Sequence, residues 1–263
     1  MQPETLVLDS RTLEAAWWSP DGARPPLVLL HEGLGSVGLW RGFPARLAQA
    51  TGRAVMAWSR FGYGQSDPQA PPWPLDYMHR EALETLPRVL DRAGIDRCVL
   101  IGHSDGASIA AIAAGIGERR RYRGLVLIAP HFFVEDITIA SIAQAKQQYE
   151  AGGLREKLAR HHRHPDVAFY GWNGAWLDPG FRTSFDLTDE LAHIRVPILI
   201  LQGKNDPYGT EAQARLAEQT CDCPVRTVLL DAAHAPHLEA PEVTLAAITG
   251  FVRHLFQVHE NAD

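Results

Sequence analysis

The serine at position 104 stands between two glycines, in the sequence Gly102-His103-Ser104-Asp105-Gly106. The apolar run 98–101 precedes it and the alanine-rich run 107–114 follows, which predicts a turn from a buried strand into a helix. Such a turn holds its middle residue at positive φ, and glycines two positions away let neighbouring backbone pass without Cβ clashes. Ser104 would then stand at a helix N-terminus, where free N–H groups favour a developing negative charge. The pattern predicts a nucleophilic serine.

Other serines lack this setting, because Ser36, Ser66 and Ser108 each miss one of the two flanking glycines. A serine hydroxyl is a poor nucleophile at neutral pH unless a neutral imidazole takes its proton. The imidazole works best when a buried carboxylate fixes its tautomer and stabilises its charged form. Ser104 therefore needs a histidine and an acid from elsewhere in the chain.

Two later loops contain those groups. Asp206 follows an apolar run in the sequence Gly203-Lys204-Asn205-Asp206, and His234 follows a second apolar run in Asp231-Ala232-Ala233-His234. Nucleophile, acid and base then come in the chain order Ser, Asp, His, which is typical of one arrangement of this triad.

The elements that must position these residues alternate along the chain. Residues 5–8 and 13–18 predict an antiparallel hairpin, and buried strands are expected at 27–31, 54–58, 98–101, 124–129, 197–203 and 225–230. Helices are expected between them at 40–51, 78–93, 107–114 and 213–219, with a closing helix at 241–256. This βαβ rhythm predicts an α/β protein with a mostly parallel, doubly wound sheet, whose functional loops lie at the carboxyl ends of the strands.

These motifs together resemble the α/β-hydrolases, in the esterase-like branch that uses a serine nucleophile. The resemblance rests on the Ser104 pentapeptide, Asp206, His234, the run His31-Glu32-Gly33-Leu34-Gly35, and the turn at 60–66, and it extends nearly end to end. It implies an α/β-hydrolase fold with eight strands and an inserted helical cap. It also implies no cofactor, and an oxyanion hole made by the backbone N–H groups of Gly33 and Asp105.

Each member of the triad has a competitor. Some α/β-hydrolases place the acid after the sixth strand, where Glu135 and Asp136 stand, but the turn that contains Asp206 is the commoner arrangement. His237 competes with His234, yet the base of the family follows the last strand directly, so we prefer His234.

Two residues depart from the family pattern. Many relatives have glycine where this chain has Glu32, and the usual aspartate before Arg60 is Ser59. Glu32 would then either bind a polar group of the substrate or support its own loop.

The βαβ rhythm is interrupted between residues 131 and 195 by helical patterns that are rich in aromatic residues. We expect residues 1–130 and 196–263 to form the core, and 131–195 to form a cap, or lid, over the site. The alternative is a helical subdomain whose aromatic residues are simply its own core. If the cap lines the pocket, the expected substrate-binding residues are Phe132, Phe133, Trp172 and Trp176, together with Glu32 of the core.

Composition excludes several classes of function. The chain of 263 residues has a formal net charge of -6 and no basic face, so nucleic acid is not an expected partner. No run is long and apolar enough to span a bilayer, and the first residues lack the features of a signal peptide, so we expect no membrane partner and a cytoplasmic protein. The cysteines, at positions 98, 221 and 223, suggest neither a disulfide framework nor a paired metal site. His161 and His164 have helical spacing, but no nearby carboxylate completes a metal site, and we expect none.

The sequence therefore predicts a hydrolase that needs no cofactor and acts on an ester, thioester or lactone of a small, largely apolar acyl group. The same triad also serves hydrolases of carbon–carbon bonds, acyltransferases and perhydrolases, and some relatives with this fold are ligand receptors. The sequence leaves these alternatives and the oligomeric state open.

Overall fold

The computed structural model describes residues 1–19 and 21–260, and the strands within these residues form one eight-stranded sheet. Its order is β1-β2-β4-β3-β5-β6-β7-β8. The hairpin β1 (Gln2–Leu8) and β2 (Arg11–Trp18) is antiparallel and joins β4 (Arg53–Trp58) antiparallel. Strands β4, β3 (Ala23–Leu30), β5 (Cys98–His103), β6 (Tyr122–Ile128), β7 (Ile198–Gly203) and β8 (Val225–Leu230) run parallel. The expected α/β fold with a mostly parallel sheet is confirmed.

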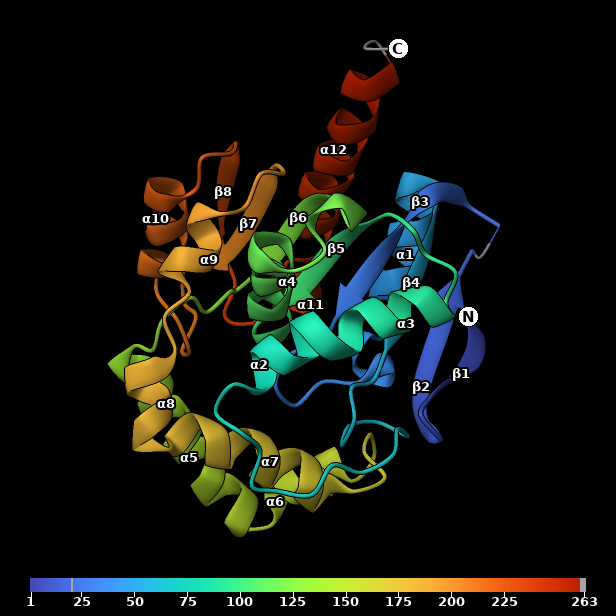
Figure 1. Cartoon of the computed structure of the whole chain (residues 1–263). Coiled ribbons are helices and arrows are strands. Elements are labelled where there is room, and N and C mark those ends of the chain that lie inside the picture. Colours follow the sequence, from blue (N-terminus) through green and yellow to red (C-terminus); the bar gives the residue numbers. More distant parts are fainter. Residues whose placement is uncertain (20, 261–263) are drawn as a thin grey trace.

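Helices cover both faces of the sheet (Figure 1). Strand residues alternate between two buried apolar clusters, so that Leu27 and Leu29 belong to one cluster and Val28 and Leu30 to the other. Helices α1 (Phe43–Thr51) and α12 (Pro241–Glu260) cover the first face, and α3 (Leu86–Arg92), α4 (Asp105–Ile116) and α10 (Glu211–Thr220) cover the second. A π-helical turn at Glu81–Thr85 joins α2 (Tyr77–Arg80) to α3, and short 3-10 turns lie at Val37–Trp40 and Arg119–Arg121. This is the doubly wound arrangement that the alternating pattern predicted.

A second group of helices lies between β6 and β7. Helices α5 (Asp136–Glu150), α6 (Gly153–Leu158), α7 (Pro165–Leu177) and α8 (Pro179–Ser184) gather beyond the carboxyl ends of the strands (Figure 1). Their aromatic side chains share one apolar cluster with the strands, since Trp176 and Phe181 are continuous with Leu100 and Leu127. We propose that α5–α8 are the expected cap.

Helix α9 (Thr188–Ala192) follows the cap helices but lies beside α4 and α10 (Figure 1). Gly115 of α4 fits so tightly against the backbone of Glu190 that a Cβ there would clash with it. Leu191 is fully buried in the apolar cluster on this face. The end of the 131–195 segment thus packs as part of the helical layer that covers the sheet.

Among residues 1–19 and 21–260, no helix combines the length and the apolar composition that crossing a bilayer requires.

The turn from β5 into α4 places Ser104 at the edge where the parallel strands end. Ser104 has φ 53 and ψ -119, and its N–H donates to the carbonyl of Ile128 in β6 at 2.9 Å. A Cβ at Gly106 would collide with the carbonyl oxygen of Leu30 in β3, and one at Gly102 would collide with the backbone of Gly106. The two glycines therefore let α4 approach the sheet closely enough to make the turn.

This close approach makes position 106 sensitive to a single methyl group. Gly106→Ala forces α4 away from β3, so we expect the free energy of unfolding to fall by about 3 kcal/mol. Gly174→Ala is the matched control, because Gly174 lies inside α7 with no neighbouring atom within 4 Å of a Cβ, and alanine there should stabilise by about 0.5–1 kcal/mol. Urea unfolding of both variants measures the difference, and equal stabilities would contradict this account of the turn.

Candidate active site

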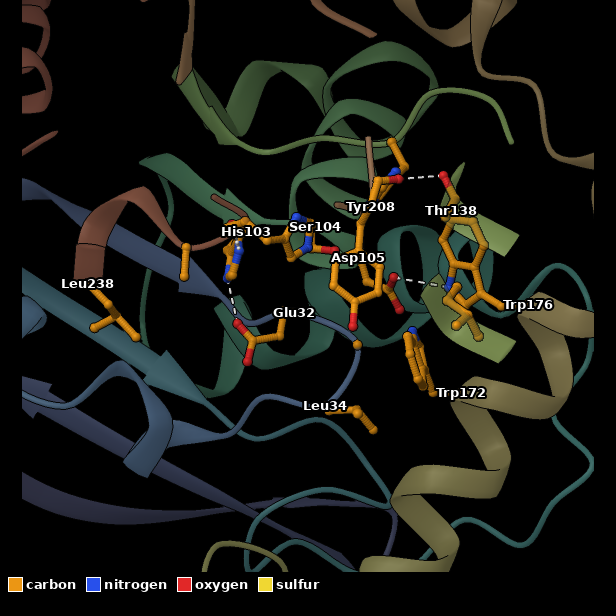
Figure 2. A pocket seen from close by; sticks show the side chains of 15 residues that line it. Glu32, Leu34, His103, Ser104, Asp105, Thr138, Trp172, Trp176, Tyr208 and Leu238 are labelled. Atoms are coloured by element: carbon orange, nitrogen blue, oxygen red, sulfur yellow. Dashed lines mark hydrogen bonds and ion pairs between the residues drawn. The ribbon is translucent and has the colours of Figure 1, made fainter. Parts of the chain in front are cut away.

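A pocket of about 200 Å³ opens where the loops after the parallel strands meet helices α5 and α7 of the proposed cap (Figure 2). Ser104 and His234 both line it, as do Gly33, Asp105 and Glu32. These residues follow β3, β5 and β8, whose carboxyl ends lie at one edge of the sheet because the strands are parallel. The topology thus brings together residues that are far apart in the sequence.

His234 is held by Asp206 from the loop after β7. Its Nδ1 lies 2.9 Å from both carboxylate oxygens of Asp206, which also accept the N–H of Tyr208 at 2.8 Å and the side-chain amide of Gln202 at 3.0 Å. Burial by itself raises the pKa of the Asp206 carboxyl, but the hydrogen bond and charge of His234, together with the N–H of Tyr208, outweigh it and the pKa is lowered. Asp206 is therefore ionised and accepts a proton-bearing Nδ1, which leaves Nε2 of His234 with its lone pair available to take a proton.

The competing acids lie elsewhere. The Glu135 carboxylate accepts both the N–H and the hydroxyl of Thr210 and the amide of Gln213, while Asp136 forms an exposed ion pair with Arg182. Glu135 supports the start of α10, and neither residue shows a contact with His234.

The competing base is enclosed. His237 begins α11 (Pro236–Glu239), is 3% exposed, and packs against the rings of Trp40 and Phe43. Burial lowers the pKa of His237 to about 3. His237 does not line the pocket that contains Ser104, whereas His234 does.

Arg60 orients the loop that contains Gly33. The buried guanidinium donates to the carbonyl oxygen of His31 at 2.5 Å and to that of Glu32 at 3.0 Å. The C=O of Glu32 and the N–H of Gly33 belong to one planar trans peptide group, so they point in opposite directions. With the oxygen turned toward Arg60, the N–H of Gly33, which lines the pocket, points away from Arg60.

The same argument applies to Asp105. The C=O of Ser104 accepts the N–H groups of Ala107 at 2.8 Å and Ser108 at 3.1 Å, so it points along α4. The N–H of Asp105 shares that peptide group and points out of the N-terminus of α4, where a helix has no internal acceptor for it. Both N–H groups expected in the oxyanion hole thus have orientations that suit the role.

The side chain of Asp105 ties the core to the cap (Figure 2). It is 1% exposed and accepts the hydroxyl of Tyr77 at 2.5 Å and the indole N–H of Trp176 at 3.2 Å. Burial raises the pKa of the Asp105 carboxyl. Asp105 therefore combines a backbone N–H at the N-terminus of α4 with a side chain that anchors α7.

The structure brings two of the four expected cap aromatics into the pocket. Trp172 and Trp176 line it, and the indole of Trp172 covers Gly33 so closely that a Cβ at that glycine would clash with the ring. Phe132 and Phe133 do not line it, which corrects the expectation based on their position after β6. The N–H of Phe132 instead donates to the amide oxygen of Gln213 at 2.7 Å, and Phe132 is fully buried outside the pocket lining.

Sequence reasoning missed several residues around the site. His131, rather than Phe132, lines the pocket after β6, together with Tyr208 after β7 and Thr138 and Ile142 of α5. Position at the carboxyl end of a strand was the signal for His131 and Tyr208. Ser59 stands where many relatives have an aspartate before Arg60. Its hydroxyl donates to the carboxylate of Glu14 in β2 at 2.7 Å, so Glu14 supplies a carboxylate near this position. That contact joins β2 to the loop after β4 and leaves no local pattern.

The histidine-rich stretch at 161–164 has a structural contact. His162 is 2% exposed, and its Nδ1 accepts the N–H of Gly64 at 2.9 Å while its Nε2 donates to the carbonyl of Leu34 at 2.9 Å. His162 therefore links the segment before α7 to the loops that contain Leu34 and Gly64. In the described part of the chain, no group of three His, Cys, Asp or Glu residues is placed to hold a metal ion.

Comparisons with known proteins agree with this architecture. The model of the alpha/beta hydrolase family matches residues 27–247. The chain is 24% identical over 267 residues to the 3-oxoadipate enol-lactonase 1 of Acinetobacter baylyi. The alignment covers 92% of this chain and 94% of that protein.

Two solved structures show the same fold. An esterase from Exiguobacterium antarcticum superposes with a TM-score of 0.75 at 20% identity, and the match covers 96% of this chain and 100% of that one. The enol-lactonase from Burkholderia xenovorans LB400 has a TM-score of 0.73 at 18% identity, and the match covers 95% and 100% of the two chains.

The contact between Asp206 and His234 can be tested against the neighbouring alternative. Asp206→Asn keeps the shape but removes the charge that selects the tautomer of His234, so kcat for ester hydrolysis should fall by about 10⁴-fold. Asp136→Asn should leave kcat within about two-fold, because that exposed carboxylate contacts only Arg182. Steady-state kinetics of both variants measures these changes. A large loss of kcat in Asp136→Asn with little loss in Asp206→Asn would show that the acid of the triad follows β6.

Proposed function

The chain belongs to the alpha/beta hydrolase family and is a hydrolase, and on that premise we propose that it cleaves an ester, thioester or lactone of a small, largely apolar acyl group. In this proposal Ser104 is the nucleophile, His234 the general base and Asp206 the residue that orients it. One observation carries the proposal. A serine at positive φ shares a pocket with a histidine whose Nδ1 is fixed by a buried aspartate.

The chemistry follows from the directions of these groups. Nε2 of His234 takes the hydroxyl proton as Oγ of Ser104 attacks the carbonyl carbon, and the N–H groups of Gly33 and Asp105 bind the resulting oxyanion. When the intermediate collapses, the bond to the leaving group breaks and His234 gives that group its proton. A water molecule, deprotonated by His234, then attacks the acyl-enzyme, and the acid leaves with Ser104 restored.

The pocket walls support the choice of substrate class. Away from Ser104 they are apolar, with Leu34, Ile142, Trp172 and Trp176. Within the described residues, no lysine or arginine lines the pocket, so a carboxylate on the acyl chain would find neither of these cations to pair with. A neutral and compact acyl group fits this lining best.

The names of the relatives favour particular types of bond for the substrate. Solved structures of the same fold carry the names of an esterase and an enol-lactonase, and the relative in Acinetobacter baylyi is named an enol-lactonase. Ester and lactone cleavage use the same attack by a serine on an acyl carbon. These names support acyl chemistry for the pocket of this chain.

A fluorophosphonate probe tests the proposed nucleophile. Wild-type protein should be labelled at Ser104 and should turn over p-nitrophenyl acetate many times, while Ser104→Ala should lose labelling and about 10⁶-fold in kcat. Ser184→Ala is the control, because Ser184 is exposed on α8 outside the pocket and should label normally. Labelling that persists in Ser104→Ala would refute the assignment, and release of a single equivalent of p-nitrophenol without turnover would favour a ligand receptor.

A substrate panel tests whether the cap sets the choice of acyl group. Trp172→Ala removes the indole that covers Gly33 and opens the pocket, so the ratio of kcat/KM for bulky over short acyl esters should change about ten-fold or more. Tyr170→Ala is the matched control, because Tyr170 is on the same helix, 40% exposed and outside the pocket. An equal loss for all esters, with a lower Tm, would show that Trp172 serves only the packing of the cap.

A further inference from the structure

His103 makes two contacts that join the loop after β3 to the loop after β8. Its Nδ1 lies 2.5 Å from Oε2 of Glu32, and its Nε2 lies 2.7 Å from the backbone carbonyl oxygen of His234 (Figure 2 shows the first contact). His103 is 2% exposed, whereas 32% of the Glu32 side chain is exposed, so the ring is enclosed and the carboxylate reaches it from the pocket wall. The ring therefore connects Glu32 to the backbone of the proposed general base.

These contacts favour a protonated ring. The carbonyl oxygen of His234 only accepts hydrogen bonds, so Nε2 of His103 carries a proton, and a second proton on Nδ1 gives the ring the charge that attracts the Glu32 carboxylate 2.5 Å away. The ring is then an imidazolium paired with the Glu32 carboxylate. Burial opposes charge on both groups, but their mutual attraction outweighs it, so the pKa of Glu32 is lowered to about 2 and that of His103 is raised.

The titratable groups that pack around His103 are compatible with a single positive charge, located on His103. The ring of His234 lies 5.1 Å from that of His103, with Asp206 behind it, and the ring of His237 in α11 lies 4.8 Å away. His131, next to His234, completes the cluster. Burial lowers the pKa values of His131 and His237 to about 3, and the charge of His103 adds to both shifts, so those two rings are neutral.

We propose that Glu32 and His103 form a positioning pair, in which Glu32 keeps His103 protonated so that its Nε2 always donates to the carbonyl of His234 and holds the proposed base in place. This inference rests on the proposed function. It also gives Glu32 a different role from the substrate contact expected from the sequence. Although Glu32 lines the pocket, its carboxylate is engaged by His103.

The pair gives activity an upper pH limit. A neutral His103 has one N–H for two acceptors, and in the tautomer that serves Glu32 a lone pair faces the carbonyl of His234. Because the pKa of His103 is raised, the pair is present at neutral pH and is lost as the pH rises through that value. Because the pKa of Glu32 is lowered, acid breaks the pair only near pH 2.

The charge of His103 can be measured directly by ¹⁵N NMR of the histidine rings, with His103 assigned through its own backbone resonances. In the wild-type protein both ring nitrogens should show imidazolium shifts at neutral pH, and in Glu32→Gln the ring should become neutral there. A neutral His103 in the wild-type protein at neutral pH overturns the proposal. The wild-type measurement needs neither catalysis nor a variant.

The positioning role is tested by the pH profile of kcat for p-nitrophenyl acetate, from about pH 5 to about pH 10. The wild-type profile should have an alkaline limb at the pKa that NMR reports for His103. In Glu32→Gln this limb should move below pH 7, and a limb at about pH 6 lowers kcat at pH 7 about ten-fold. Glu32→Asp should restore part of the loss, because it keeps the carboxylate.

Glu242→Gln is the matched control, since it breaks the exposed ion pair with Arg46 and should leave the profile unchanged. An active Glu32→Gln enzyme with the wild-type profile refutes the positioning pair. If the wild-type protein hydrolyses no ester, the proposed function fails instead, and the NMR titration still decides whether the pair exists.

Discussion

The close contact between α4 and β3 leaves no room for a side chain at Gly106, and the geometry of the site depends on that contact. It lets the chain reverse within the turn that holds Ser104 at a φ of 53. It also brings the N-terminus of α4 next to the loop that leaves β3, so that Gly33 and Asp105 line the same pocket. A wider separation would part the serine from one of the two N–H groups proposed to serve it.

Two buried side chains, Arg60 and the proposed imidazolium of His103, hold backbone carbonyls of the site in defined directions. Arg60 draws the carbonyls of His31 and Glu32 inward, and His103 draws the carbonyl of His234 toward itself. A buried charge is tolerated only where it is paired or fully hydrogen-bonded, and each of these donors meets that condition through more than one contact. Since the donors are held on several sides, the loops they contact have little freedom to rearrange.

The sequence was most informative where a contact is local. The hairpin, the βαβ alternation and the positive φ of Ser104 each follow from a short pattern, and the structure confirms them. Ser104, Asp206 and His234 were selected as a triad from their places after strands, and their roles remain a proposal. What the patterns could not show are contacts between distant segments, such as Glu14 with Ser59, or Gln213 with the backbone of Phe132.

The cap and the proposed oxyanion hole are coupled through two tryptophans of α7. Trp172 lies against Gly33, and Trp176 donates its indole N–H to Asp105, so each ring rests on one of the two residues whose N–H groups are proposed to bind the oxyanion. The two tryptophans are four residues apart, on one face of the helix, and a shift of α7 would move both contacts together. An acyl group that fills the space beside these rings therefore also fixes the wall that carries the oxyanion donors. Substrate fit and stabilisation of the transition state then depend on the same helix, and specificity in this pocket should appear in kcat as well as in KM.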